Sequence, residues 1–237
     1  MDTPEALWKS ICDKLRAEIL QGAWSAGAQL PTEASLAKRF DVNRHTIRRA
    51  LKTLSTDGLV TARRGAGVFI NPRPVPYRIG MRTRFRQNLL SAGRTPSRKI
   101  LHLDIQRATE PEATALQLTI GAPLHVLEAV SLADDLPISL ARSCFCAKRF
   151  PDLDAELRQS GSVTQALAQM GVSDYTRKTT RLTGHNADPV QARHLQIKVG
   201  DALILSEAVN IDHSAVPIEF GRTYFVGSRV ELVLEGP

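Results

Sequence analysis

The chain has 237 residues, a formal net charge of +7 and an apolar share of 43%. That length suits two domains of ordinary size, and the apolar share is enough for buried cores, which excludes a disordered chain. Residues 1–75 hold 12 Lys and Arg against 7 Asp and Glu, whereas the remainder holds 19 against 17. The excess positive charge lies mainly in the first third, which indicates a polyanionic partner for that part.

Cysteine use and hydropathy limit the compartment. Cys12, Cys144 and Cys146 are too few for a disulfide framework, and no nearby His or third Cys completes a metal site with the last two. The start, MDTPEALWKS, lacks the basic and apolar runs of a secretory signal, and no apolar stretch approaches the ~20 residues of a membrane span. We therefore expect a cytoplasmic protein without metal, cofactor or membrane contact.

Residues 5–71 predict three short helices followed by a hairpin. Apolar residues recur at helical spacing over residues 7–19, a second helix follows a candidate N-cap at Thr32, and a third runs from its cap Asn43 to about Ser55. Two short β-rich runs, LVTAR and GVFI, flank the turn RGAG. This order is that of a winged helix-turn-helix, whose third helix enters the DNA major groove by its N-terminal end.

The third predicted helix has a basic outer face. With Ile47, Leu51 and Leu54 toward a core, the outer side carries Arg44, His45, Arg48 and Lys52. An arginine that reads guanine is worth ~1–3 kcal/mol of discrimination. Arg63 and Arg64 on the hairpin suit phosphates or the minor groove. The alternative is a solvated charged face without a partner, which the combination of cap, turn and basic glycine-containing wing disfavours.

The segment LPTEASLAKRFDVNRHTIRRALKTLSTDGLVTARRGAGVFI resembles the DNA-binding domain of the GntR family of bacterial repressors. The likeness runs through a Leu-Pro-x-Glu lead, a Val-x-Arg-x-Thr-x-Arg core and a Gly-x-Gly wing. It implies a homodimer on near-palindromic double-stranded operator DNA, with contacts at Glu33, Arg44, His45, Thr46, Arg48, Arg64, Gly65 and Gly67. Glu33 has an alternative role, because an acid near phosphates more often orients an arginine than touches DNA.

The stretch NPRPVPYRIG, residues 71–80, contains three prolines and predicts an extended, semi-rigid connection. We therefore expect a DNA-binding domain over 1–71, a linker over 72–80 and an effector-binding domain over 81–237. Residues 78–100 are rich in arginine and contain no acid, and a helical pattern there ends at Gly93. Arginines clustered at a helix start suit an anion; the alternative is that they extend the DNA footprint.

The second part of the chain contains a duplication. GAPLHVLEAVSLADDLPISLARSCF begins at Gly121, and GDALILSEAVNIDHSAVPIEFGRTYF begins at Gly200. Both run through Gly, an apolar strand, Glu-Ala-Val, a polar turn, Pro-Ile and a second strand with an arginine, and a short helix precedes each. Two such units predict an antiparallel sheet with pseudo-two-fold symmetry.

Alternation along these strands predicts two different faces. One face pairs Glu128 with Arg142 and Glu207 with Arg222, which we interpret as cross-strand ion pairs worth ~0.2–1 kcal/mol rather than as catalytic pairs. Small and polar residues form the other face, which suits the floor of a ligand pocket. They are Ala129, Ser131, Ser139, Ala141 and Ser143 in the first copy, and Ser206, Ala208, Asn210, Glu219, Gly221 and Thr223 in the second.

Residues 78–235 resemble the UTRA ligand-sensing domain of the HutC branch of GntR regulators, a fold similar to chorismate lyase. The expected fold class is therefore α+β, a winged helix-turn-helix plus an antiparallel sheet with helices. The motifs MRTRFRQNLLSAG and SDYTRKTTRLTG resemble the PhnF type, which controls phosphonate uptake and breakdown. The resemblance implies effector binding by Arg84, Phe85, Arg86, Ser162, Thr164, Arg177, Glu219 and Thr223. Sugar-phosphate sensors have arginines where Ala129 and Ser131 stand, which argues against an amino-sugar phosphate.

We therefore expect a dimeric transcriptional repressor that senses a small anion, either a phosphonate or phosphate or, as the alternative, another carboxylate or a sugar acid. No Ser-His-Asp or Cys-His arrangement emerges, so no catalytic residue is assigned. Two other classes stay open: a chorismate-lyase-like enzyme with a DNA-binding head, and a DNA-architectural protein with a merely structural second domain. The small-residue strand face disfavours the second of these.

Overall fold

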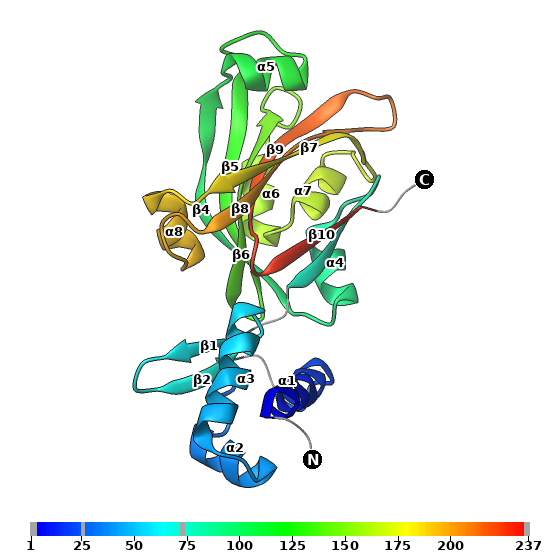
Figure 1. The fold of residues 1–237 in the computed structure, drawn as a ribbon. Helices are drawn as coiled ribbons and strands as arrows, with labels where there is room; N and C mark the ends of the chain where they lie inside the picture. The colour runs from blue at the N-terminus through cyan, green and yellow to red at the C-terminus, as the bar shows by residue number, and fades with distance from the viewer. Residues whose placement is uncertain (1–3, 25–26, 72–73, 235–237) are drawn as a thin grey trace. The chain divides into compact units, whose positions relative to one another are not determined.

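Residues 4–24, 27–71 and 74–234 are described in the computed structural model, and the chain divides into two units, Met1–Arg73 and Pro74–Pro237 (Figure 1). The first unit has three helices and a two-stranded antiparallel hairpin: α1 (Pro4–Leu20), α2 (Glu33–Phe40), α3 (Arg44–Thr56), β1 (Val60–Arg63) and β2 (Gly67–Ile70). These are the elements of the expected winged helix-turn-helix.

Local signals set the bounds of α2 and α3. The side chain of Thr32 accepts a hydrogen bond from the backbone of Ser35, and that of Asn43 accepts one from the backbone of Thr46, as N-caps do. Between them, Asp41 takes a left-handed conformation with φ 52° and ends α2. All three helices and the hairpin bury apolar residues in one core, which includes Leu15, Leu36, Ile47, Leu54 and Ile70.

The second unit is built on one six-stranded antiparallel sheet in the order β4-β5-β6-β9-β8-β7. Its strands are β4 (Pro96–Arg107), β5 (Pro123–Ala133), β6 (Leu136–Cys146), β7 (Thr176–Asn186), β8 (Ala202–Ile211) and β9 (Pro217–Val226). Its helices are α4 (Phe85–Ser91), α5 (Glu110–Leu116), α6 (Leu153–Ser160), α7 (Val163–Gln169) and α8 (Pro189–Leu195). The fold class is α+β, as expected.

The duplication is visible in the sheet. Each copy contributes an outer strand, a short helix with a capping box, and a hairpin, and the two hairpins meet where β6 pairs with β9. Glu128 lies opposite Arg142, and Glu207 lies opposite Arg222. Ion pairs join the first two side chains at 2.9 Å and the second two at 3.1 Å, which confirms the predicted pairing.

Helices cover both faces of the sheet. On the face that carries the ion pairs, α5 and α8 pack over apolar residues such as Val126 and Leu203. On the other face, α6 and α7 pack over Leu127 and Phe145 at one end, whereas α4 packs near Ile138 at the other end. Figure 1 shows α6 and α7 side by side against the sheet. The small and polar residues lie between these two covered areas.

The stretch expected as a linker differs from that expectation over residues 75–79. These residues form β3 (Val75–Ile79), which pairs in parallel with β10 (Val230–Leu234). Val75, Tyr77 and Ile79 are buried while Pro76 and Arg78 are exposed, an alternation that ties the strand to the second unit. Pro76 is compatible with this because the ladder has only two strands, so one side of β3 needs no donor. Residues 72–73 lie outside the described part.

Candidate functional site

The first turn of α3 presents cationic side chains to solvent. The Asn43 Oδ1 atom accepts hydrogen bonds from the backbone N–H and the hydroxyl of Thr46, both at 2.9 Å, which fixes the start of the helix. Arg44 and His45 follow directly and are exposed. Within the described residues neither side chain makes a hydrogen bond or an ion pair, so both are free to bind a partner.

Arg48 is exposed on the same helix but is held in place by Glu33. Its Nε and Nη2 atoms donate to the two carboxylate oxygens of Glu33 at 3.1 and 2.7 Å. The hydrogen bond from Arg48 lowers the pKa of Glu33, and the nearby charges of Arg44 and His45 add to this effect. The structure therefore brings these four predicted residues together and shows that Glu33 orients an arginine, the alternative role expected from the sequence.

The hairpin turn carries the other predicted DNA contacts, Arg64, Gly65 and Gly67. Both glycines have positive φ, 75° and 104°, which glycine adopts without strain. A side chain at Gly67 would also collide with the side-chain amide of Gln29. Gln29 donates to the carbonyl of Ala66 at 2.8 Å and so holds the turn. Sequence reasoning missed Gln29, because its contact depends on a loop far away in the chain.

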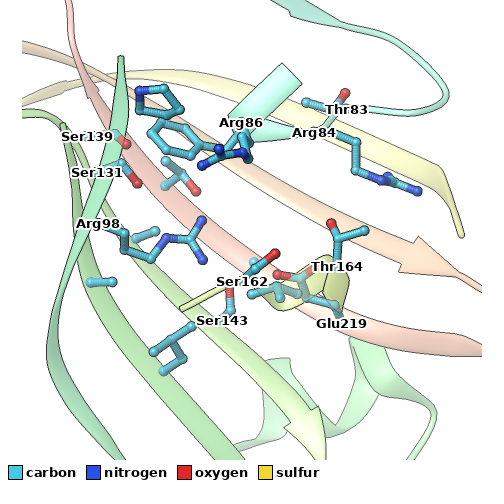
Figure 2. Close-up of a pocket in the computed structure, with 18 of the residues that line it drawn as sticks. Thr83, Arg84, Arg86, Arg98, Ser131, Ser139, Ser143, Ser162, Thr164 and Glu219 are labelled. Carbon is cyan, nitrogen blue, oxygen red and sulfur yellow. The ribbon is translucent and has the colours of Figure 1, made fainter. Parts of the chain in front are cut away.

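The second unit contains a cavity of about 760 Å³, and all eight predicted effector-binding residues line it. The cavity lies on the small-residue face of the sheet, where Ala129, Ser139, Ser143 and Gly221 leave room above the strands. Figure 2 shows Ser131, Ser139 and Arg98 on one side of the cavity, and Thr164 and Glu219 on the other. The predicted pocket floor and the predicted lining residues therefore belong to one site.

Arg84 contributes to the wall of the cavity through internal contacts. Its Nη2 atom donates to the carbonyl of Tyr175 at 2.7 Å and to Asp174 at 3.2 Å, and its guanidinium stacks on the Tyr175 ring at 3.5 Å. These contacts tie the start of α4 to the segment before β7. Arg86, two residues later, is exposed and makes no hydrogen bond or ion pair within the described residues, so it differs from Arg84 in being available to a ligand.

A chain of hydrogen bonds fixes the acidic side of the cavity. Arg177 Nε donates to Asn210 Oδ1 at 3.3 Å, and Asn210 Nδ2 donates to Glu219 Oε2 at 2.7 Å. Thr164 shares a hydrogen bond of 3.1 Å with the hydroxyl of Tyr175. Asn210 was expected on this face but was not among the predicted site residues, and it is the residue that links Arg177 to Glu219.

Arg98 is the main cavity residue that sequence reasoning missed. It lies on β4 directly opposite Ser131, so both side chains share the cavity face. Burial lowers the pKa of its guanidinium, while the charge of Glu219 counteracts this. The register that aims Arg98 inward depends on a bulge between Ile100 and His102. The bulge is not visible in the sequence, so alternation alone does not show which arginine of this stretch faces the cavity.

Two features are lacking in the described part of the chain. Within its residues, no group of three or more His, Cys, Asp or Glu side chains is arranged to hold a metal ion. No helix there is long and apolar enough to cross a membrane.

Comparisons with known families cover both units. The family model described as bacterial regulatory proteins, gntR family, matches residues 7–70, and the UTRA domain model matches residues 91–231. A relative in Rhizobium meliloti, the "Uncharacterized HTH-type transcriptional regulator RB1450", is 38% identical over 232 residues, which cover 97% of this chain and 95% of the relative.

A second relative is the Escherichia coli protein named "Probable transcriptional regulator PhnF". It is 30% identical over 230 residues, which cover 96% of this chain and 94% of that protein. Among solved structures, that of PhnF from Mycobacterium smegmatis is similar with a TM-score of 0.67 and 24% identity, covering 95% of this chain and 98% of that one. That likeness concerns the fold.

Proposed function

This chain belongs to the GntR family of bacterial regulatory proteins and is a DNA-binding transcriptional regulator with a UTRA domain of the HutC type, not an enzyme; we propose that it is a homodimeric repressor of phosphonate uptake or metabolism genes. Its effector is a phosphonate or a phosphate-like anion that binds in the cavity of the second unit. The observation that carries this proposal is the cavity itself, which contains all eight predicted effector residues and one further cation, Arg98. Neither Arg98 nor Arg86, which is one of the eight, has an ion-pair partner in the described part.

In the DNA complex, α3 lies in the major groove. Arg44, His45 and Thr46 read base edges from the first turn of this helix, because their side chains project beyond the apolar face that holds the helix on its core. Arg48, fixed by Glu33, binds a phosphate, as do the side chain of Arg64 and the backbone around Gly65 and Gly67. A homodimer places two such helices in successive grooves ~34 Å apart, which requires a near-palindromic operator.

Two findings support the phosphonate role. The relative named PhnF shares 30% identity over nearly the whole of both chains. The cavity also offers guanidinium groups and hydroxyls, the donors that bind phosphoryl oxygens well. Another carboxylate or a sugar acid remains the second candidate, because guanidinium groups bind carboxylates with the same geometry.

Selection from random DNA with the purified chain, followed by gel shifts, tests this function. We expect a near-palindromic site, bound by a dimer in sedimentation experiments. A phosphonate should change the affinity for that site, whereas a carboxylate of similar size should not. If the selection enriches no common sequence, the proposed role of α3 in reading DNA is contradicted. A response to carboxylates alone would favour the second candidate.

A further inference from the structure

The cavity has groups of opposite charge on its two sides. Arg98 enters from β4, next to Ser131 and Ser139, and Arg86 is near the start of α4 (Figure 2). Within the described residues the Arg98 guanidinium makes no hydrogen bond or ion pair, and it lies over the Phe85 ring, 5.5 Å from the ring centroid. Arg98 is partly buried, and the charge of Glu219 acts on it without a direct ion pair. A partly buried cation without a hydrogen-bonded partner is costly, because burial removes water that no other group replaces. An anion bound on this side of the cavity would therefore be stabilised.

The other side of the cavity has carboxylate and hydroxyl oxygens that can accept hydrogen bonds from a ligand. Glu219 is only 9% exposed, and its Oε2 atom accepts the hydrogen bond from Asn210. Its Oε1 atom has no hydrogen-bond partner within the described residues. A Cβ atom added at Gly221 would lie 3.7 Å from Oε1 and 3.8 Å from the Ser143 hydroxyl, so the glycine keeps the space beside these two acceptors open.

We infer that the effector carries both charges: a phosphoryl oxyanion that binds Arg98 and Arg86, and a protonated amine that binds Glu219 Oε1 and the Ser143 hydroxyl. This inference rests on the proposed role of the cavity as an effector site. A purely anionic ligand would place negative charge in the same cavity as the buried Glu219 carboxylate, and like charges in a desolvated site repel. A neutral ligand would leave the Arg98 guanidinium and the Glu219 Oε1 atom without a charged hydrogen-bond partner.

Two classes of compound share this chemistry, aminoalkylphosphonates and phosphate esters of amino alcohols. They differ by one ester oxygen between carbon and phosphorus, so the charged groups of the cavity do not distinguish one class from the other. 2-Aminoethylphosphonate and phosphoethanolamine represent the two sources as probes. Tighter binding of 2-aminoethylphosphonate would identify the effector as a phosphonate, and tighter binding of phosphoethanolamine would identify it as a phosphate ester.

Calorimetric titration of the full chain with a matched pair of ligands tests the inference. 2-Aminoethylphosphonate and propylphosphonate have the same length, but a methyl group replaces the ammonium group in the second. We expect the wild-type chain to bind the aminated ligand roughly 10- to 100-fold more tightly, since hydrogen bonds to charged groups have about that effect. Equal binding, or tighter binding of propylphosphonate, would overturn the zwitterion inference and leave an anionic effector in place.

Variants assign the two contacts. Glu219→Gln should abolish the preference for the aminated ligand, whereas Arg98→Gln should weaken both ligands, and Arg98→Lys should restore part of the loss. Glu231→Gln, which removes an exposed carboxylate on β10 outside the cavity, is the matched control and should change neither affinity. A Glu219→Gln variant that keeps the full preference would contradict the inference. Failure of every phosphonate and phosphate ester to bind wild-type protein would overturn the proposed effector as well.

Discussion

Arg44 and Arg63 differ in what each can recognise. Arg44 is in the first turn of α3 with a free guanidinium, whereas Arg63 is on the hairpin and stacks on the Phe69 ring at 4.6 Å. We predict that Arg44→Ala abolishes specific binding, with a loss of ~1–3 kcal/mol of base discrimination per subunit. Arg63→Ala should weaken binding to all DNA alike. Gel shifts with the selected operator and with random DNA at one salt concentration measure both, and an unchanged footprint for Arg44→Ala would contradict the role of α3.

His125 is a buried polar residue without a visible function. Its side chain is only 1% exposed, and neither ring nitrogen has a hydrogen-bond partner in the described part of the chain. A buried polar group without a partner costs about 1–3 kcal/mol. His125→Leu should therefore raise the free energy of unfolding by roughly 1 kcal/mol, since part of the gain is offset by the different shape of the branched leucine side chain in a packed core. Chemical denaturation followed by circular dichroism measures this change.

Circular dichroism is the suitable probe because both tryptophans, Trp8 and Trp24, are in the first unit. His125→Asn, which keeps a polar group in the same place, is the control and should not stabilise the protein. A loss of stability on changing His125 to leucine would show that the ring nitrogens are satisfied in solution.

At the scale of elements, the start of α5 depends on one buried carboxylate. Burial alone would raise the pKa of Glu112, but hydrogen bonds from Thr109 and Arg142 lower it to about 2. A carboxyl group whose pKa is lowered by folding stabilises the protein above its unfolded pKa, and that contribution is lost as the pH falls through the folded pKa. Glu112 should therefore contribute up to about 3 kcal/mol near neutral pH and progressively less between roughly pH 5 and pH 2.

The second copy of the repeat provides the design for this test. Gln191 takes the place of Glu112 in the capping box of α8, where its side chain accepts from the backbone of Asp188 at 3.0 Å. Glu112→Gln should therefore keep the cap and lose only the ion pair with Arg142. We predict a loss of stability at pH 7 that disappears toward pH 2, whereas Glu110→Gln, on the exposed side of the same helix, should have little effect. A loss that is the same at both pH values would contradict this account.

Elements with a periodic or repeated sequence could be predicted, and those that depend on distant partners could not. The hairpins follow from their alternation and from the Asp134-Asp135 turn, where both residues have positive φ. By contrast, α6 and α7 have only eight and seven residues and were not predicted. The prolines around β3 predict a linker, and no local pattern reveals the strand, because its partner β10 is about 150 residues later in the chain.

The same distinction holds for the cavity. The lining residues on β8 and β9 follow from alternation, and those on α4 follow from a motif. Arg98 faces the cavity because of a bulge, and Tyr175 is held by Arg84 across 91 positions of sequence. Neither the orientation of Arg98 nor the contact between Arg84 and Tyr175 can be predicted from a local sequence pattern.

At the scale of the whole molecule, β3 is the strand of the second unit that follows the boundary between the two units. It begins at Val75, directly after the boundary between the units, and Tyr77 and Ile79 on it line the cavity. We expect a bound effector to pack against these side chains and to change the affinity of the chain for its operator. A ligand shifts a conformational equilibrium only by the difference in its affinity for the two states. That difference in affinity sets the coupling free energy between effector binding and operator binding.

The most direct test is the affinity of the full chain for its selected operator, measured by fluorescence anisotropy with and without 2-aminoethylphosphonate. We predict that saturating ligand changes the operator Kd by at least about 5-fold, within the usual range of allosteric coupling. The Arg98→Gln variant should bind the operator with the wild-type affinity and show no change with ligand. An operator Kd that is the same with and without ligand in the wild-type chain, although the ligand binds, would contradict the account.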